Sequence, residues 1–368
     1  MEQFKTASGV VFDFEENQSP APVEQRAAAL SHPRFGTVFS DHMVRIDWTA
    51  TAGWAKPKVV ANVPISLSPA AAVLHYGQEI FEGMKAYRWA DSSIWCFRPW
   101  VNAQRFARSA ARIALPELDP AVYVASLEAL MQVDHTWVPS EADTSLYLRP
   151  FMFASEAFVG VRPAREVTYL LIASPVGSYF PGGLTPVSIW VDTERHRAAP
   201  GGTGAAKCGG NYAASLVSQE LAAKEGCEQV LFLDAVTGTQ LEELGGMNVM
   251  VITADGTMLT PPAGQTVLEG VTRDSIMQLV RDRDQAVEER PIDLSWLLDA
   301  IRQGQVTEVL ACGTAAVVTP IGRLKGQGFD VVVGDGQSGE LTRYLHNQIN
   351  AIYYGQVADS HGWTYRLH

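Results

Sequence analysis

One lysine of the sequence lies within a run of small residues, and a tyrosine follows it five positions later. The stretch from Pro200 to Tyr212 reads Pro-Gly-Gly-Thr-Gly-Ala-Ala-Lys-Cys-Gly-Gly-Asn-Tyr. Its glycines allow positive φ angles and the close approach of a bulky planar group. A lysine that is held away from bulk water loses part of its charged form, which makes Lys207 a candidate amine nucleophile.

Two other interpretations of this stretch compete. A phosphate-binding loop of the Gly-x-x-x-x-Gly-Lys-Ser/Thr type needs a glycine before the lysine and a hydroxyl after it. The neighbours here are Ala206 and Cys208, so that loop is excluded. A flexible surface loop with a solvated lysine remains, and it is the commoner meaning of a glycine-rich segment taken alone. Residues elsewhere in the chain must decide between a nucleophilic lysine and a solvated surface loop.

Two kinds of side chain could act beside the lysine. Glu242 and Glu243 precede two glycines. They are either a solvated acidic pair, or one carboxylate turns inward and keeps a heteroaromatic nitrogen protonated. Tyr212 is either a core side chain or a donor to a phenolate oxygen next to an imine.

Candidate anion ligands lie at the starts of predicted helices and in one tight turn. Arg105 is either a surface charge on a helix or one arm of a phosphate clamp. The amides of Val271 and Thr272 begin another helix and could bind the same phosphate. Thr314 and Ala315 either form a plain turn or supply a hydroxyl and amides to an anion.

Aromatic and basic side chains suggest a place for a substrate. Tyr147 and Arg149 are two residues apart in a predicted strand, so they share a face, and a planar guanidinium suits an acidic substrate. Tyr76, Phe81 and Tyr179 are more often core aromatics than pocket lining. Taken singly, every one of these residues favours a structural role. Together they describe one ligand with an aldehyde, a ring nitrogen, a ring hydroxyl and a phosphate, which is pyridoxal 5′-phosphate.

Composition limits the classes of protein that this chain can belong to. The 368 residues are 47% hydrophobic and 18% charged, which is typical of a soluble globular enzyme with two domains. The net charge of −12 argues against nucleic acid or a membrane as a partner and favours small-molecule substrates. Four scattered cysteines show no metal-ligand spacing and predict a reduced, cytoplasmic protein.

The pattern of elements predicts an α+β fold with two domains and mostly antiparallel strands. Residues 1–30 are expected to form an arm or a mobile tail, and a helical turn is expected to end at Gly83. We expect a smaller N-terminal domain over 1–176, an interdomain loop over 177–186 and a larger domain over 187–368 that carries Lys207. Predicted strands are 41–48, 145–153, 167–173, 187–191, 229–234 and 249–253, and predicted helices are 102–115, 120–135, 211–224 and 341–354.

The sequence closely resembles the branched-chain amino acid aminotransferases, which are class IV (fold type IV) pyridoxal-phosphate enzymes. The resemblance covers about residues 35–356. It is carried by Leu74-His-Tyr-Gly-Gln-Glu-Ile-Phe-Glu-Gly-Met-Lys-Ala-Tyr87, Phe97-Arg-Pro-Trp100 with Arg105, Leu146-Tyr-Leu-Arg-Pro150, Tyr179-Phe-Pro-Gly-Gly183, the lysine stretch, Glu242 to Asn248, Gly270-Val-Thr-Arg273 and Gly313-Thr-Ala315, in the family's order.

The resemblance implies a role for each candidate. Pyridoxal 5′-phosphate forms a Schiff base with Lys207, which later moves a proton between Cα and C4′. Glu243 pairs with the pyridine nitrogen because it stands in the family's Glu-x-Gly motif, which leaves Glu242 the weaker candidate, and Tyr212 bonds the ring O3′. Phosphate ligands are Arg105, Val271, Thr272 and Thr314; substrate carboxylates meet Tyr76, Tyr147, Arg149, Thr314 and Ala315; Phe81 and Tyr179 form an apolar pocket.

The implied activity is transfer of the amino group of L-leucine, L-isoleucine or L-valine to 2-oxoglutarate. Val159 and Val161 match a loop that crosses to the partner subunit in this family, so a homodimer is implied. Ala316 and Thr319 stand where some members carry a Cys-x-x-Cys redox pair, and Gly246 replaces a threonine. Alternatives are a D-amino-acid transaminase, an aminodeoxychorismate lyase or a non-catalytic cofactor-binding homologue. The long N-terminal region and the Tyr-x-Arg pair argue against the first two.

Overall fold

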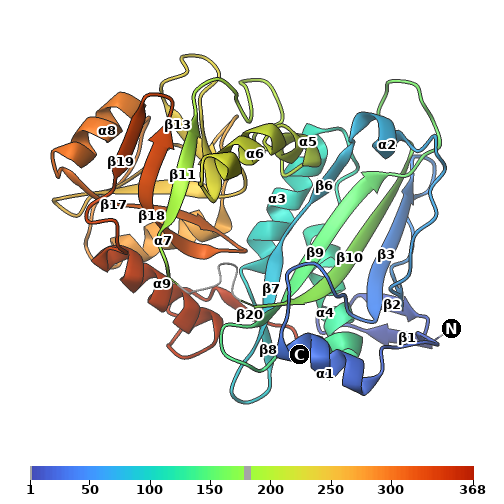
Figure 1. The fold of residues 1–368 in the computed structure, drawn as a ribbon. Coiled ribbons are helices and arrows are strands. Elements are labelled where there is room, and N and C mark those ends of the chain that lie inside the picture. Colours follow the sequence, from blue (N-terminus) through green and yellow to red (C-terminus); the bar gives the residue numbers. More distant parts are fainter. Residues whose placement is uncertain (1, 178–183) are drawn as a thin grey trace. The chain divides into compact units, whose positions relative to one another are not determined.

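A computed structural model describes residues 2–177 and 184–368 of the chain (Figure 1). Contacts between Cα atoms divide the chain into two units, one of Met1–Tyr179 with Ala351–His368 and one of Phe180–Asn350. Each unit is built around its own β-sheet. Within the described ranges, no helix has both the length and the apolar character needed to cross a membrane.

The first unit contains a sheet in which the described residues form 11 strands, in the order β1-β2-β5-β3-β10-β9-β7-β8-β20, with β4 on β3 and β6 on β9. All neighbouring pairs are antiparallel except β2 and β5. The strands are β1 Glu2–Lys5, β2 Val11–Phe14, β3 His42–Thr49, β4 Gly53–Trp54, β5 Lys58–Ala61, β6 Glu79–Phe81, β7 Met84–Arg88, β8 Ile94–Phe97, β9 Ser145–Ala154, β10 Glu166–Val176 and β20 Thr364–Arg366.

Two long helices of this unit pack on each other and against the sheet (Figure 1). Helix α3 begins at Pro99, three residues before the expected start, because proline is well suited to the first helical position. Helix α4 begins as predicted, with the Asp119 side chain accepting a hydrogen bond from the amide of Ala121. The helices are α1 Val23–Ser31, α2 Ala72–Tyr76, α3 Pro99–Arg112 and α4 Pro120–Asp134, followed by the 3-10 turn η1 His135–Trp137.

Two features of the first unit bear on the expectations. Residues 1–30 were expected to form an arm or a mobile tail, and the tail is excluded, since β1 and β2 form a hairpin that joins the sheet through β5 and buries Phe12 completely. The helical turn ends at Gly77 instead of Gly83, because Gly77 adopts the left-handed conformation that ends helices. Residues 79–81 then form β6 on β9, with Ile80 fully buried.

The second unit contains a mixed sheet of nine strands among the described residues, in the order β13-β12-β11-β18-β17-β14-β15-β16, with β19 on β18 and β13 also on β14. The strands are β11 Val187–Asp192, β12 Gln229–Leu233, β13 Leu241–Leu244, β14 Asn248–Thr253, β15 Met258–Thr260, β16 Val287–Glu289, β17 Val306–Gly313, β18 Val317–Gly326 and β19 Phe329–Val332. The helices are α5 Gly209–Ala213, α6 Leu216–Lys224, α7 Val271–Arg281, α8 Leu294–Arg302 and α9 Glu340–Tyr353.

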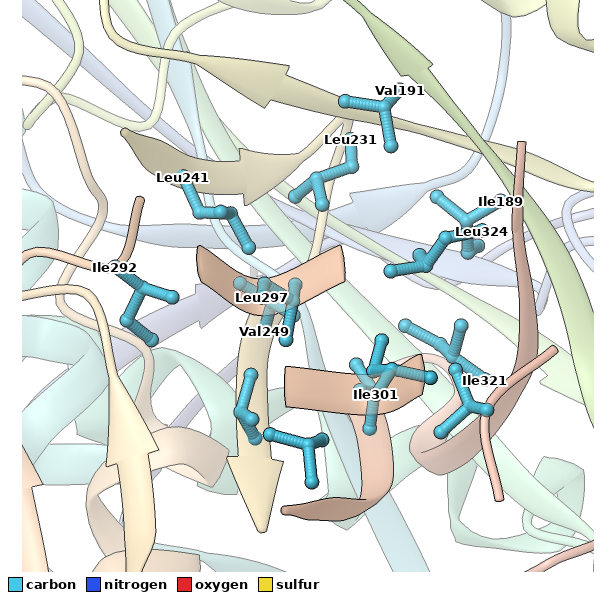
Figure 2. Close-up of a cluster of buried hydrophobic side chains, with 14 of the residues drawn as sticks. Ile189, Val191, Leu231, Leu241, Val249, Ile292, Leu297, Ile301, Ile321 and Leu324 are labelled. Carbon is cyan, nitrogen blue, oxygen red and sulfur yellow. The ribbon is translucent and has the colours of Figure 1, made fainter. Parts of the chain in front are cut away.

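Alternating side chains cover both faces of this sheet. Ile189 and Val191 of β11 face a large cluster that includes Leu297 and Ile301 of α8 (Figure 2). Trp190, between them in sequence, faces α6 in a second cluster. Strand β11 therefore buries apolar side chains on both faces of the sheet.

Two further boundaries differ from the expected ones. The expected helix 211–224 is interrupted between Ala213 and Leu216, so that α5 and α6 are separate helices. The C-terminal residues, expected in the second domain, contribute β20 to the sheet of the first unit by pairing with β8. Most of the expected interdomain loop, 177–186, lies outside the described residues.

Candidate active site

The lysine loop follows β11 and is folded tightly onto neighbouring chain. A Cβ atom at Gly204 would lie 2.6 Å from Cα of Thr266, so only glycine allows this approach. The side chain of Asn211 donates to the carbonyls of Thr203 and Ala206, both at 2.8 Å. Asn211 is itself buried at the start of α5. The loop is therefore a fixed support for Lys207, which decides against the solvated surface loop.

The side chains of the candidate residues Lys207 and Tyr212 are in contact. Lys207 Nζ donates to the phenolic oxygen of Tyr212 at 2.8 Å, and both side chains are half-buried. The short helix α5 creates this contact because it returns the chain over the loop within five residues. Gly246 lies beside the pair, since a Cβ there would contact the Tyr212 ring at 3.4 Å. An amine and a phenol are thus held together within reach of solvent.

Glu243 is a buried carboxylate on β13, only 4% exposed. Its Oε1 lies 2.5 Å from Nη2 of Arg197 and accepts from the amide of Leu268 at 3.1 Å. Its Oε2 accepts from the side-chain amide of Asn248 at 3.1 Å. Burial raises the pKa of this carboxyl, whereas Arg197, the Leu268 amide and the charge of Lys207 each lower it. The ion pair with Arg197 and the hydrogen bonds from the Leu268 amide and the Asn248 side chain favour the ionised form and oppose the effect of burial.

Glu242 has fewer hydrogen-bonding groups around its carboxylate than Glu243 has. It is also buried, but its Oε2 has no hydrogen-bond partner within the part of the chain that the structure describes. Burial raises its pKa, against smaller lowering effects of Thr266 and Arg197. Consecutive strand residues point to opposite faces, so the two carboxylates cannot share a role. The structure therefore favours Glu243 as the acid of the site.

The candidate anion ligands of this unit gather near Asn248. Helix α7 begins at Val271, and the Asn248 carboxamide fills the space over Gly270, where a Cβ would lie 2.0 Å from Oδ1. Asn248 pairs across the sheet with Cys312, two residues before Thr314. Val271 and Thr272 provide the first-turn amides of an 11-residue helix.

In the first unit, Arg105 is fixed by Glu82. Its Nε and Nη2 donate to the two carboxylate oxygens at 2.7 and 2.8 Å, and both side chains are at most 5% exposed. Asn102, one turn earlier on α3, donates to the same carboxylate at 2.9 Å. Arg105 is thus a buried, oriented cation and not a surface charge.

Tyr147 and Arg149 share a face of β9 and are in contact. Arg149 Nη2 donates to the Tyr147 hydroxyl at 3.0 Å, and the guanidinium lies over the ring of Phe81, 4.8 Å from its centroid. Gly83 leaves the room for the phenol, because a Cβ there would lie 2.0 Å from the Tyr147 oxygen. The structure therefore brings three predicted substrate residues together.

Tyr76 is the last residue of α2 and is exposed. Its hydroxyl donates to the backbone carbonyl of Val159, so Tyr76 belongs with the loop that carries Val159 and Val161. That loop is held by Arg162, which donates to both oxygens of Glu156 at 3.0 and 2.8 Å. Tyr179 lies outside the described residues.

Comparison with known proteins fits this geometry. Residues 79–324 match the sequence model of the family described as amino-transferase class IV. The branched-chain-amino-acid aminotransferase of Mycolicibacterium smegmatis is 50% identical over 360 residues, which are 97% of this chain and 98% of that protein. The chain belongs to the class IV aminotransferases.

Solved structures agree in fold with this class IV aminotransferase. The Escherichia coli branched-chain amino acid aminotransferase superposes with a TM-score of 0.73 at 26% identity, covering 88% of this chain and 99% of that one. The branched-chain aminotransferase of the archaeon Thermoproteus uzoniensis gives a TM-score of 0.71 at 23% identity, covering 88% and 99%. The predicted α+β class, with mixed and mostly antiparallel sheets, is confirmed.

The class IV family implies pyridoxal 5′-phosphate, and the second unit offers groups that fit it. An aldehyde needs an amine, which is Lys207, and a ring oxygen needs a hydrogen-bond donor, which is Tyr212. A basic ring nitrogen needs an ionised carboxylate, and the ion pair of Glu243 with Arg197 and its two hydrogen bonds favour that form. The first turn of α7 offers amides to a phosphate.

Sequence reasoning assigned no role to four buried residues that hold the site, Glu82, Arg197, Asn211 and Asn248. All but Arg197 lie inside motifs that carry the family resemblance. In the sequence, Arg197 could be noticed only as a charged residue ten positions before Lys207. Its partners, Thr266 and Glu243, are distant in sequence, so only the fold could show them.

Proposed function

We propose that this aminotransferase transfers the amino group of L-leucine, L-isoleucine or L-valine to 2-oxoglutarate. The observation that carries the proposal is the hydrogen bond between Lys207 Nζ and Tyr212, in the same unit as the buried carboxylate of Glu243. The names of the relatives support the substrate class, because a protein 50% identical over 97% of this chain is a branched-chain-amino-acid aminotransferase.

We propose that Lys207 binds pyridoxal 5′-phosphate covalently through Nζ. When bound, the cofactor supplies an electron sink for the negative charge left on the substrate Cα. Glu243 stabilises the proton on the ring nitrogen that this sink requires. Tyr212 donates to the ring oxygen, and its present hydrogen bond orients the lysine amine.

Lys207 also serves as the general base. When not bonded covalently, Nζ would be free to accept the proton from the substrate Cα and to return it on the cofactor side. The same lysine then performs these transfers in reverse with 2-oxoglutarate as the acceptor. The two substrates therefore bind alternately, in a ping-pong cycle.

The first unit contributes the remaining proposed ligands. Arg105 binds the phosphate, with Val271, Thr272 and Thr314 from the second unit. Tyr147 and Arg149 receive substrate carboxylates, together with Tyr76, Thr314 and Ala315. Phe81 and Tyr179 line an apolar pocket, and Val159 and Val161 come from the partner of a homodimer. A planar guanidinium beside a phenol and an aromatic face suits both an aliphatic chain and a γ-carboxylate.

We place the enzyme in the cytoplasm. Its four cysteines, at 96, 208, 227 and 312, are all buried free thiols. Burial raises the pKa of Cys96 and Cys312 to about 12, so these thiols are unreactive at neutral pH.

The test is the visible absorption spectrum of the purified protein loaded with pyridoxal 5′-phosphate. We expect a band from the lysine-bound cofactor that is lost on addition of L-leucine and returns with 2-oxoglutarate. Lys207→Ala should lack both the band and measurable turnover. If the band responds to another amino acid but not to L-leucine, the protein is an aminotransferase with a different substrate class. Normal leucine turnover by Lys207→Ala would refute the mechanism.

A further inference from the structure

A single buried guanidinium connects three parts of the second unit. Arg197 follows β11 and its side chain is 4% exposed. Its Nη2 lies 2.5 Å from Oε1 of Glu243 and donates to the carbonyls of Thr266 at 2.6 Å and Gly204 at 3.1 Å. The three acceptors belong to β13, to the segment before α7 and to the lysine loop.

The contact with Gly204 matters because that residue lies within the lysine loop. Gly204 packs closely on Thr266, since a Cβ at Gly204 would lie 2.6 Å from Cα of Thr266. Arg197 donates to both carbonyls and forms an ion pair with the carboxylate of Glu243. The distance between the acid and the loop that carries Lys207 is therefore set through this guanidinium.

The positive charge of Arg197 also affects the ionisation of Glu243. The titratable groups that act on Glu243 are Arg197, Lys207, Glu242 and the thiol of Cys312. Burial and Glu242 favour the protonated acid, and the Cys312 thiol is neutral at working pH. Lys207 is the other cation that lowers the pKa of Glu243. Arg197 cannot lose its proton, so its charge is constant through the reaction.

We infer that Arg197 is a positioning residue, which keeps Glu243 ionised and fixes it relative to the loop of Lys207. This inference rests on the proposed role of Glu243 as the partner of the ring nitrogen. It assigns Arg197 no contact with the substrate or with the cofactor. Its effect reaches the reaction only through the ionisation and placement of Glu243.

The first experiment uses the cofactor-loaded enzyme with Arg197→Gln, which removes the charge, and Arg197→Lys, which keeps it. Arg195→Gln is the matched control, because Arg195 is two residues away and its side chain is 41% exposed. We expect Arg197→Gln to lower kcat for L-leucine roughly tenfold to a hundredfold with little change in KM. The acidic limb of the pH profile should move to higher pH, since Glu243 must be ionised. Arg197→Lys should restore part of the lost kcat and part of the shift in the acidic limb.

The second experiment needs no activity. In cofactor-free protein, Arg197→Gln leaves a buried carboxylate without its counter-ion, whereas Arg197→Gln with Glu243→Gln leaves none. We expect the double variant to unfold at a higher temperature than Arg197→Gln alone. The pH dependence of the bound cofactor's absorption should also shift in Arg197→Gln and not in Arg195→Gln.

The outcomes separate the two ideas. If Glu243→Gln changes the cofactor spectrum and the rate with leucine, but Arg197→Gln only lowers thermal stability without moving the acidic limb, Arg197 is merely structural and the inference is wrong. If Glu243→Gln itself leaves spectrum and rate intact, the proposed role of Glu243 fails and the inference fails with it. If the acidic limb moves to higher pH in Arg197→Gln and Arg197→Lys partly reverses this shift, the inference that Arg197 is a positioning residue is supported.

Discussion

At the scale of single residues, Glu82 determines what Arg105 can do. The carboxylate holds Nε and Nη2 of the guanidinium and accepts a third bond from Asn102. Two buried charges that are fully paired stabilise each other, but removal of one partner leaves an uncompensated ion. A preoriented guanidinium also binds a phosphate without a further loss of side-chain freedom.

We therefore predict that Glu82→Gln loses about 3 kcal/mol of unfolding free energy and weakens binding of pyridoxal 5′-phosphate. Denaturant unfolding of the cofactor-free protein and titration with the cofactor measure the two effects. Glu141→Gln, at an exposed position, is the control. A loss of less than about 1 kcal/mol, the size of an ordinary hydrogen bond, would show that Asn102 and the remaining contacts suffice to hold Arg105.

Arg149 allows a second prediction at this scale. Its guanidinium touches the Tyr147 phenol and lies over the Phe81 ring, which are the contacts of a cation at the edge of an apolar wall. Arg149→Ala should raise KM for 2-oxoglutarate more than KM for L-leucine, because only the former carries a γ-carboxylate. Arg149→Lys should raise KM for 2-oxoglutarate by an intermediate amount, because lysine keeps the positive charge but lacks the planar guanidinium that can hold a carboxylate through two hydrogen bonds. Equal losses for both substrates would contradict the assignment.

The sequence named candidate ligand-binding residues and assigned no role to the residues that support them. Lys207 with Tyr212, and Tyr147 with Arg149, lie within five residues of each other, so local geometry brings them together. The contact of Arg197 with Glu243 joins residues far apart in the chain and depends on how strands pair. A buried charge cannot be told from a surface charge by residue type alone.

At the scale of elements, strand β7 buries a lysine. Lys85 is 8% exposed, between neighbours β8 and β9 in the sheet, and it pairs across the sheet with Tyr147. Burial lowers its pKa from 10.5 to about 8, because the charged form is poorly solvated there. Between these two values the unfolded chain binds more protons, so stability rises with pH; below about pH 8 the full cost of the buried charge is present.

We predict that Lys85→Met stabilises the protein at pH 7 by on the order of 3 kcal/mol, and that this gain disappears between pH 8 and 10.5. Denaturant unfolding of variant and parent, compared at each pH, measures the difference. Lys58→Met on β5 is the control, since the Lys58 side chain is 42% exposed. A gain of the same size at both ends of the pH range would exclude titration of Lys85 as its cause.

Elements with strong local signals were predicted well, and short ones were not. Alternation of apolar residues predicted β9, a run of apolar residues predicted β10, and the Asp-Pro pair predicted the start of α4. Strand β6 has three residues and was predicted as the end of a helical turn, because its conformation comes from pairing with β9. Residues 1–30 were predicted only as an arm or a mobile tail for the same reason: the hairpin β1–β2 joins the sheet by pairing with β5.

At the scale of the whole chain, the last residues return to the first sheet. Strand β20 pairs with β8, so the C-terminal end of the chain belongs to the unit in which the chain began. No sequence pattern could predict this, because a three-residue strand has no periodicity of its own. Truncation at the C-terminus should therefore destabilise the first unit.

The first unit also carries an exposed apolar surface, which consists of Leu74, Tyr76, Val159 and Val161. Val159 is 58% and Val161 89% exposed, and the hydroxyl of Tyr76 joins α2 to their loop. The ion pair of Arg162 with Glu156 keeps this loop in one conformation. Exposed apolar side chains on a rigid loop are typical of an interface between proteins.

We predict that the enzyme sediments as a dimer, at about twice the mass of one chain, and that Val161→Asp weakens the dimer. A carboxylate in an apolar interface must be desolvated, so we expect Kd for dimerisation to rise at least roughly tenfold, which is about 1.4 kcal/mol. Val236→Asp is the control, because Val236 is 74% exposed but lies in the second unit. Sedimentation equilibrium over a range of concentrations measures both. An unchanged dimer in Val161→Asp would remove this loop from the interface.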